Sequence, residues 1–359
     1  MFNDLPDVLK QPVDSSDGVA GMERPRKLLD SIAEDVTPLL SLARHHIVSA
    51  RQFTREQIIQ LVRLAAAYET SRLYIKPLSG KILITAFYEP STRTRLSFES
   101  AWHRLGGDVM SITDANTTGI AKGESLQDVA EMFSNYGDVV VLRDSEDESV
   151  YKMTERLRIP IVNAGNGIDE HPTQALADMY ALLKWKPELC CTPEGAERIR
   201  IGIIGAPSRM RTLRSFLLCL THFSEQIEVI VINPDKDVLA ADQAAELQRS
   251  GLQISVVSAL QSVLPTLDVV YINSIAWVGE SYERLTGDIK LGSESRLKPD
   301  AIILHPLARG VELDTSLDIT AHNWYFAQAR GAVFIRMALL TCITQRVSRV
   351  TDAPIAPVR

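Results

Sequence analysis

The sequence predicts an α/β protein of two domains, each a parallel sheet flanked by helices, with a C-terminal helix that packs back on the first domain. From about residue 46, apolar segments of strand length alternate with segments of helical periodicity, which is typical of parallel sheets buried on both faces. A chain of 359 residues exceeds what one ordinary core accommodates. The charged, Pro-containing segment KWKPELCCTPEGAER at 184–198 separates two such series, so we place the domain boundary there.

Four regions follow from this pattern. Residues 1–45 are polar and contain several prolines, so we interpret them as an N-terminal extension, partly disordered, with one helix near 27–40. The first domain spans 46–187 and the second spans 188–322. Residues 323–359 form the final helix and a tail.

Strands and helices alternate through both domains. A helix at 54–69, with Thr54 as its N-cap, opens the first domain. Strands are predicted at 81–87, 108–112, 138–143, 159–162, 199–204, 227–232, 253–257, 268–272 and 301–304. Further helices are predicted at 92–105, 125–136, 149–157, 172–185, 209–222, 238–250, 260–265 and 324–346. Ligands of open parallel sheets gather at the carboxyl ends of the strands, so the residues that follow each strand are the candidates for function.

Composition and charge exclude several classes of function. Apolar residues make up 45% of the chain and charged residues 23%, as in soluble globular proteins. A net charge of −7 argues against a broad nucleic-acid surface. No apolar segment approaches the length of a membrane span, and the N-terminus lacks the apolar core of a signal peptide. We therefore expect a cytoplasmic protein with no nucleic-acid or membrane partner.

The motifs of common cofactor and metal sites do not occur. The segment GIIGAPSRMRT at 202–212 does not fit the G-x-G-x-x-G spacing of dinucleotide-binding loops, and the chain has no Walker A lysine and no H-E-x-x-H. Four cysteines without metal-ligand spacing are expected to be reduced thiols: Cys190, Cys191, Cys219 and Cys342. We predict no cofactor and no metal.

Five consecutive donor-rich residues, STRTR at 91–95, follow the first predicted strand and open a helix. A helix N-terminus carries free N–H groups and a positive dipole end, which favour anions. Hydroxyl groups add donors, and the guanidinium of Arg93 suits phosphate. The segment indicates an oxyanion or phosphate site without metal. A capped helix with surface arginines is the competing interpretation, and Arg95 is expected to be structural.

The segment HPTQ at 171–174 is the second functional signal. Pro172 suits the first position of a helix, which places His171 at the helix entrance, and Gln174 lies on the same face three residues later. An imidazole and a carboxamide can then converge on one small polar group, such as a carbonyl oxygen. A histidine that only caps its loop is the alternative.

Arg143 ends a predicted buried strand. A cation in that position needs an anionic partner, which the protein or a ligand supplies. The acidic segment DSEDES that follows it, at 144–149, is one candidate partner, and a bound anion is the other.

In this order, STRTR, HPTQ and HPLARG at 305–310 resemble the aspartate/ornithine carbamoyltransferase family over about residues 46–347. The segment YEPSTRTRLSFESAWHRLGG is most similar to the catalytic chain of the aspartate branch. The resemblance implies a carbamoyl-phosphate-binding domain at 46–187 and an amino-acceptor-binding domain at 188–322. It also implies a homotrimer with active sites shared between subunits, which transfers the carbamoyl group of carbamoyl phosphate to the amine of an amino acid and releases phosphate.

The same resemblance assigns roles to individual residues. Carbamoyl phosphate would be bound at its phosphate by Ser91, Thr92, Arg93 and Thr94, and at its carbamoyl end by Arg143, His171 and Gln174. Thr118 and Lys122, in NTTGIAKGES, match a loop that the family lends to the neighbouring subunit's site. The backbone carbonyl of Leu307 would receive the attacking amine. Charge on the reacting carbonyl would be stabilised by preorganised donors, so the predicted catalytic residues are Arg93, Thr94, Arg143, His171 and Gln174.

The predicted acceptor site departs from the family pattern. Arg211 matches an arginine that contacts the amino acid's carboxylate. Ser274 stands where aspartate enzymes carry the arginine for the side-chain carboxylate. Asn273 and Trp277 lie where ornithine enzymes carry an aspartate and a Ser-Met-Gly segment. Ala308 replaces a proline. The predicted acceptor-binding residues are Arg211, Ser274, Trp277, Leu307 and Arg309.

Three interpretations of these departures stay open. In the first, the chain is an aspartate enzyme that binds the side-chain carboxylate with another cation, such as Arg209 or Arg309. It is instead a carbamoyltransferase for a different amine, with Trp277 as one wall of a less charged pocket. Or it is a catalytically silent paralogue that acts as a subunit or regulator, against which the intact donor residues argue. Whether a regulatory subunit binds is equally open.

Overall fold

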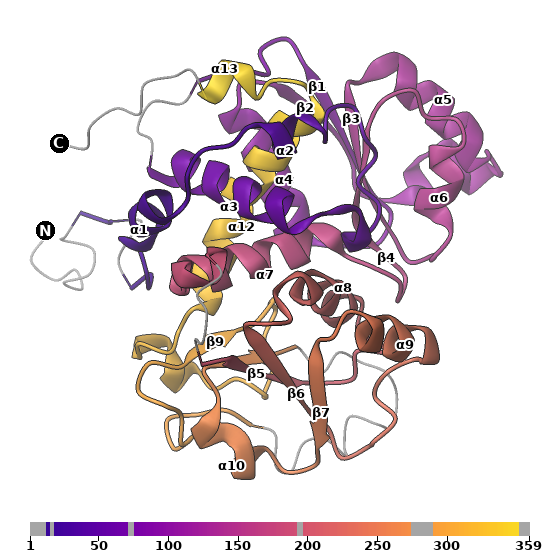
Figure 1. Ribbon diagram of the computed structural model, residues 1–359. Coiled ribbons are helices and arrows are strands. Elements are labelled where there is room, and N and C mark those ends of the chain that lie inside the picture. The colour runs from indigo at the N-terminus through magenta and orange to yellow at the C-terminus, as the bar shows by residue number, and fades with distance from the viewer. Residues whose placement is uncertain (1–11, 15–17, 71–74, 192–196, 274–289, 352–359) are drawn as a thin grey trace, which may run out of the picture.

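Two parallel sheets, each flanked by helices, form the two halves of the computed structural model (Figure 1). The structure describes residues 12–14, 18–70, 75–191, 197–273 and 290–351. This arrangement confirms the predicted fold class, and all nine predicted strands are present.

The first sheet has four strands in the order β2-β1-β3-β4, all parallel. Its strands are β1 (Ile82–Phe87), β2 (Asp108–Ile112), β3 (Val139–Asp144) and β4 (Ile161–Asn166). In the register of the two central strands, Phe87 pairs with Arg143. The loop that leaves β1 therefore begins beside the Arg143 end of β3, at the carboxyl edge of the sheet.

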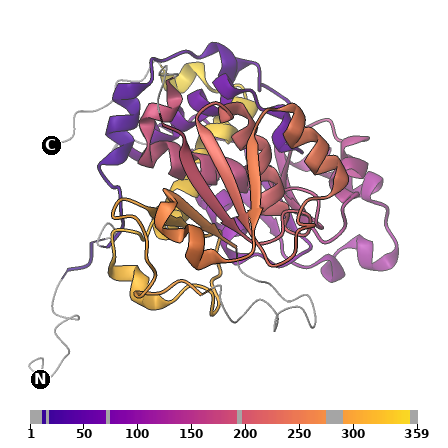
Figure 2. The ribbon, with the colours of Figure 1, turned by 60° about the horizontal axis from the view of Figure 1, so that its bottom comes forward.

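The second sheet has five parallel strands in the order β7-β6-β5-β8-β9. Its strands are β5 (Ile199–Ile204), β6 (Ile227–Ile232), β7 (Gln253–Val257), β8 (Val269–Ile272) and β9 (Ile302–Leu304). Figure 2 turns this half of the molecule toward the viewer. Apolar β-branched residues fill β5, β6 and β8, as burial on both faces requires.

Helices cover the faces of both sheets. Those of the first half are α3 (Arg55–Thr70), α4 (Thr92–Arg104), α5 (Leu126–Tyr136), α6 (Ser149–Thr154) and α7 (Pro172–Trp185). Those of the second half are α8 (Arg211–Leu220), α9 (Ala241–Arg249) and α10 (Leu260–Val263). Thr54 caps α3 as predicted, because its Oγ1 accepts the N–H of Gln57 at 3.2 Å.

Helix α12 (Tyr325–Ile343) returns from the second half and packs against α3, α4 and α7, as predicted. Figure 1 shows it in yellow among these helices, with the short α13 (Ser348–Thr351) after it. By length and composition α12 could cross a membrane, although the sequence suggested no such segment. Because 78% of this apolar stretch is buried inside the fold, α12 is a core helix.

Within the N-terminal segment, the described residues from 24 onward form two short helices. Instead of one helix near 27–40, it forms α1 (Arg24–Ser31) and α2 (Thr37–Leu40). Pro38 stands at the start of α2, where its fixed φ suits a first helical turn but interrupts a continuing helix. Leu28 and Leu39 are buried in the main core. The described part of this segment is therefore ordered around α1 and α2.

Candidate active site

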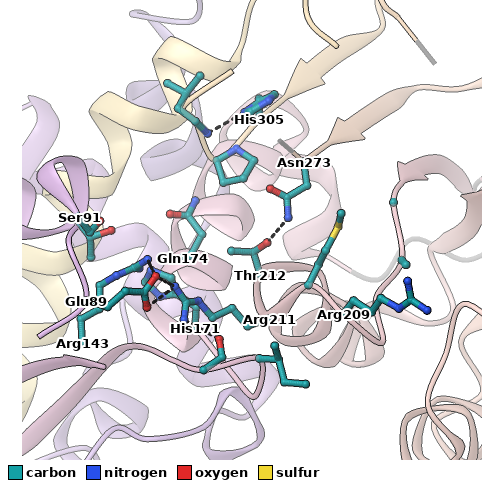
Figure 3. A pocket seen from close by; sticks show the side chains of 18 of the residues that line it. Glu89, Ser91, Arg143, His171, Gln174, Arg209, Arg211, Thr212, Asn273 and His305 are labelled. Atoms are coloured by element: carbon teal, nitrogen blue, oxygen red, sulfur yellow. Dashed lines mark hydrogen bonds and ion pairs between the residues drawn. The ribbon is translucent and has the colours of Figure 1, made fainter. Parts of the chain in front are cut away.

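A cavity of about 1680 Å³ lies between the two halves, at the carboxyl ends of strands from both sheets. Its walls come from the loops and helix starts that follow β1, β3, β4, β5, β6, β8 and β9, with α12 as a further wall. Figure 3 shows Glu89, Arg143 and His171 on one side and Arg209 and Asn273 on the other. This is the position at which open parallel sheets bind ligands.

The start of α4 presents a set of donors to the cavity. Ser91 is the N-cap in extended conformation, and its hydroxyl makes no capping hydrogen bond. The first turn of a helix leaves N–H groups without intrahelical acceptors. Arg93 lines the cavity and has no carboxylate partner among the described residues. Free donors and an unpaired cation at one helix N-terminus favour a bound phosphate.

Arg143 is held by Glu89, not by the acidic segment 144–149 that the sequence offered. Its Nη2 donates to Glu89 Oε1 at 2.7 Å and its Nη1 to the carbonyl of Ala164 at 3.2 Å. Burial and the nearby Arg211 lower the pKa of Arg143 to about 10. It therefore stays a cation at neutral pH, and Glu89 fixes where its charge lies.

Glu89 also binds Arg211, the first residue of α8. Both carboxylate oxygens accept from Nη2 of Arg211 at 2.9 Å, and Nη1 donates to the carbonyl of Gly167 at 2.6 Å. One carboxylate thus joins a first-domain and a second-domain arginine, as the dashed lines of Figure 3 show. Gly165 permits this packing, because a Cβ there would lie 3.1 Å from both guanidinium groups at a φ of +110°.

His171 precedes Pro172, the first residue of α7, as predicted. The side chain is 3% exposed. Burial, reinforced by Arg143, Arg211 and Arg336, lowers its pKa well below 6.5. The imidazole is consequently neutral at pH 7. It can donate a hydrogen bond to a carbonyl oxygen but does not add a positive charge.

Gln174 lines the cavity one turn into α7. Its Nε2 donates to Asp178 Oδ1 at 2.7 Å, and Asp178 is fully buried. The sequence predicted that His171 and Gln174 share a helix face, and both do face the cavity. The carboxylate behind Gln174 was not predicted.

The buried carboxyl of Asp178 gives the fold a pH dependence. Burial raises its pKa from 3.8 to about 7, against the effect of hydrogen bonds from Gln174, Gln328 and Tyr271. A raised pKa means that the folded state binds the proton more tightly than the unfolded state. Proton binding at Asp178 therefore adds to the free energy of unfolding; this contribution is fully present below pH 3.8 and is lost as the pH rises through about 7.

Asp178→Asn removes that titration. We expect the free energy of unfolding of the variant, relative to wild type, to increase by about 2–3 kcal/mol between pH 5 and pH 8. Urea denaturation of both proteins across this range measures the difference. A difference that does not change with pH would contradict the raised pKa.

Arg336, on α12, is a functional candidate that the sequence analysis missed. The fully buried side chain lines the cavity. Nη1 donates to the hydroxyl of Ser97, the guanidinium carbon lies 4.7 Å from the centre of the Phe98 ring, and Nε has no partner. Burial lowers its pKa to about 9. No carboxylate of the described residues pairs with this cation, so an anion in the cavity would stabilise it.

Two predicted residues of the donor site lie outside the cavity of their own chain. Thr118 is the N-cap of the 3₁₀ turn Gly119–Lys122, and Lys122 is its last residue. Neither lines the cavity. Thr118 Oγ1 donates to the carbonyl of Ala115 at 2.7 Å, and Lys122 is exposed.

The predicted acceptor residues divide into three groups. Arg211 and Leu307 line the cavity. Arg309 does not, because both of its Nη atoms bind Asp318 and its guanidinium packs on Tyr325 and Phe326. Ser274 and Trp277 lie outside the described residues. Of the two alternative cations, the structure therefore brings Arg209 to the cavity and leaves Arg309 elsewhere.

His305 orients the loop between β9 and α12. Its Nδ1 accepts the N–H of Leu307 at 2.8 Å and its Nε2 lies 3.0 Å from Glu312 Oε1. The ring therefore carries its proton on Nε2 and donates to the carboxylate. Through these two contacts His305 positions the loop that holds Leu307.

Two family models match the chain. The model described as "Aspartate/ornithine carbamoyltransferase, carbamoyl-P binding domain" matches residues 45–184, and the model described as "Aspartate/ornithine carbamoyltransferase, Asp/Orn binding domain" matches residues 197–343. The gap between the matches falls in the segment where the sequence placed the domain boundary.

Curated relatives carry the name aspartate carbamoyltransferase catalytic subunit. The protein of Methanopyrus kandleri is 37% identical over 314 residues, which cover 84% of this chain and 98% of the relative. The protein of Methanocaldococcus jannaschii is 33% identical and covers 82% and 96%. That of Clostridium novyi is 34% identical and covers 83% and 97%.

Solved structures show the same similarity. Aspartate transcarbamoylase of Trypanosoma cruzi in complex with N-(phosphonacetyl)-L-aspartic acid superposes with a TM-score of 0.77 at 33% identity, covering 86% of this chain and 98% of that one. The same enzyme in complex with carbamoyl phosphate and aspartate superposes with a TM-score of 0.77 at 32% identity, with the same coverage.

Proposed function

Because this chain belongs to the aspartate/ornithine carbamoyltransferase family, we propose which residues carry its reaction and which acceptor it uses. The chain is a carbamoyltransferase that moves the carbamoyl group of carbamoyl phosphate to the amine of an amino acid and releases phosphate. The observation that carries the proposal is the set of free donors at the start of α4, together with the unpaired Arg93. A catalytically silent role gives no reason for this set.

The donor half of the reaction needs only positioned charge. The acceptor nitrogen attacks the carbamoyl carbon, a C–N bond forms, the C–O bond to phosphate breaks, and the proton lost by the amine passes to the departing phosphate. Phosphate leaves with the bonding electrons beside the N-terminus of α4, where Ser91, Thr92 and Arg93 hold it. Thr94, Arg143 and the neutral His171 donate to the carbonyl oxygen as its charge grows. Preorganised donors of this kind lower the barrier without a covalent intermediate.

The acceptor is aspartate or a related amino acid. Its α-carboxylate lies at Arg211, whose position Glu89 and Gly167 fix. Arg209 is an exposed cation on the second-domain wall of the cavity, and the described residues offer it no ion pair. It can receive the side-chain carboxylate for which Ser274 has no charge. With aspartate as acceptor, the reaction belongs to pyrimidine biosynthesis.

A second acceptor class is favoured by two carboxylates on the same wall. Asp235 and Asp237 line the cavity and are exposed, and no cation among the described residues pairs with them. They would suit an acceptor whose side chain ends in an ammonium group, such as a diamino acid.

Steady-state release of phosphate from carbamoyl phosphate tests the proposal, with L-aspartate, L-ornithine and shorter diamino acids offered separately. We expect turnover with aspartate and none with succinate, which has both carboxylates but no amine. Turnover with diamino acids alone would replace aspartate by the second class. Phosphate release that no amine increases would overturn the proposed function.

Arg209→Gln tests the acceptor assignment. We expect the KM for aspartate to rise about tenfold or more, with a smaller change in kcat, because the side-chain carboxylate of the substrate would lose its charge partner. The KM for carbamoyl phosphate serves as the internal control and should stay near its wild-type value. An unchanged KM for aspartate would exclude Arg209 from the acceptor site.

The assembly and location of the protein belong to the same proposal. We infer a homotrimer in the cytoplasm, in which Thr118 and Lys122 of one subunit complete the cavity of its neighbour. Neither residue lines the cavity of its own chain, and Lys122 is exposed, which supports this placement.

A further inference from the structure

The buried carboxylate of Asp178 accepts hydrogen bonds from both halves of the molecule. Asp178 Oδ1 accepts from Nε2 of Gln174, on its own helix α7, at 2.7 Å and from Nε2 of Gln328, on α12, at 2.5 Å. Its Oδ2 accepts from the hydroxyl of Tyr271, on β8, at 2.9 Å. All three donors converge on a side chain with no exposed surface.

This arrangement fixes which end of the Gln174 carboxamide faces the cavity. A carboxamide has a donor end and an acceptor end, and both oxygens of Asp178 act as acceptors toward the surrounding side chains. Asp178 therefore holds the amino end of Gln174 toward the protein interior. The remaining end, Oε1, is a hydrogen-bond acceptor, and Gln174 is a lining residue of the cavity beside His171 (Figure 3).

The same carboxylate orients the opposite wall. Because Gln328 gives its amino group to Asp178, its Oε1 is free to accept the N–H of His305, at 2.8 Å. His305 in turn accepts the N–H of Leu307. Both Gln174 and the loop that holds Leu307 thus take their orientation from Asp178.

We propose that Asp178 is a positioning residue that sets which acyl phosphate the enzyme accepts, by holding Gln174 so that its Oε1 requires an N–H group on the acyl carbon. This inference rests on the proposed function. The carbamoyl group meets the requirement with its amino group, which keeps its hydrogens throughout the transfer. An acetyl group offers a methyl group at the same place, and the largely buried Oε1 of Gln174 would then lose its partner.

Two stable analogues isolate this single difference. Phosphonoacetamide resembles carbamoyl phosphate and retains the amino group, whereas acetonylphosphonate carries a methyl group there. Isothermal titration of each into the assembled wild-type protein gives the ratio of their dissociation constants. We expect phosphonoacetamide to bind at least tenfold more tightly, which is the effect of one hydrogen bond to a buried group.

Asp178→Asn should lower this ratio on the order of tenfold. The new carboxamide has one oxygen and cannot accept from all three donors, so Gln174 is free to turn. Tyr271→Phe is the matched control, because it removes the third hydrogen bond and leaves the one to Gln174; the ratio should stay at its wild-type value. A loss of general packing would instead weaken both analogues equally and leave the ratio unchanged in every variant.

A double-mutant cycle separates positioning from structure. In a Gln174→Leu background, Asp178→Asn should have no further effect on the ratio, because the group through which it acts is gone. An unchanged ratio in Asp178→Asn, with the fold intact by circular dichroism, would overturn this inference while carbamoyl transfer by the wild type stood. If the wild type binds neither analogue, the proposed function itself fails.

Discussion

Arg93→Gln is expected to reduce carbamoyl transfer by about 10²- to 10³-fold, which is the typical cost of removing one preorganised donor from a charge-stabilising site. Arg93 stands in the first turn of α4, lines the cavity and has no carboxylate partner among the described residues. Its charge is therefore available to the leaving phosphate. Initial rates at saturating carbamoyl phosphate and acceptor measure the loss in kcat.

Arg95→Gln is the matched control for that experiment. Arg95 lies two residues further along the same helix, and its Nη1 pairs with Glu99 at 3.1 Å and 3.2 Å. The pair is a partly exposed contact one helical turn apart, so its loss should cost only about 0.3–0.5 kcal/mol in stability. Its kcat should stay within a few-fold of wild type. Equal losses in the two variants would show that α4 lacks the proposed phosphate site.

Lys122→Ala is expected to reduce activity as much as Arg93→Ala does, although Lys122 lies outside the cavity of its own chain. If the neighbouring subunit supplies Lys122, the two inactive proteins should complement each other. A cyclic trimer of mixed chains contains one site with both native residues, so a random equal mixture should recover about a quarter of wild-type activity.

The mixing experiment requires trimers that have exchanged subunits. Mass spectrometry of chains with different tags identifies the mixed species, and each variant refolded alone provides the baseline. Mixed trimers without recovered activity would place Lys122 outside the shared site.

The periodicity of the sequence predicted the fold because most strands are short apolar segments buried on both faces, while the edge strands β2 and β7 are largely exposed. The predicted strand boundaries were less accurate where polar residues take part in a strand. β4 extends to Asn166, four residues beyond the prediction. Asn163 and Asn166 are buried there, because Asn163 donates to the carbonyl of Val48 and to Asn166 Oδ1. Val48 lies 115 residues from Asn163, and a partner this far along the chain leaves no trace in local periodicity.

The candidate site was predicted where a motif is contiguous and missed where its partners are distant. STRTR and HPTQ each occupy one helix start, so Arg93 and His171 could be found from the sequence. Glu89 adjoins the first motif, but it binds Arg211, which lies 122 residues away. This contact could be seen only in the folded structure, where the two sheets are placed relative to each other. Arg336 lies in helix α12, where an arginine inside the apolar segment AVFIRMALL was the signal to notice.

Because this chain joins a carbamoyl carbon to an amino acid nitrogen, an isotope label on that carbon follows the reaction. Carbamoyl phosphate labelled with ¹³C at the carbonyl is incubated with the protein and L-aspartate, and the products are observed by NMR. We expect the labelled carbon to become a ureido carbon bonded to the aspartate nitrogen, with one phosphate released for each transfer. If the label appeared only in cyanate and bicarbonate, at the rate seen without protein, the chain would not be a carbamoyltransferase for aspartate.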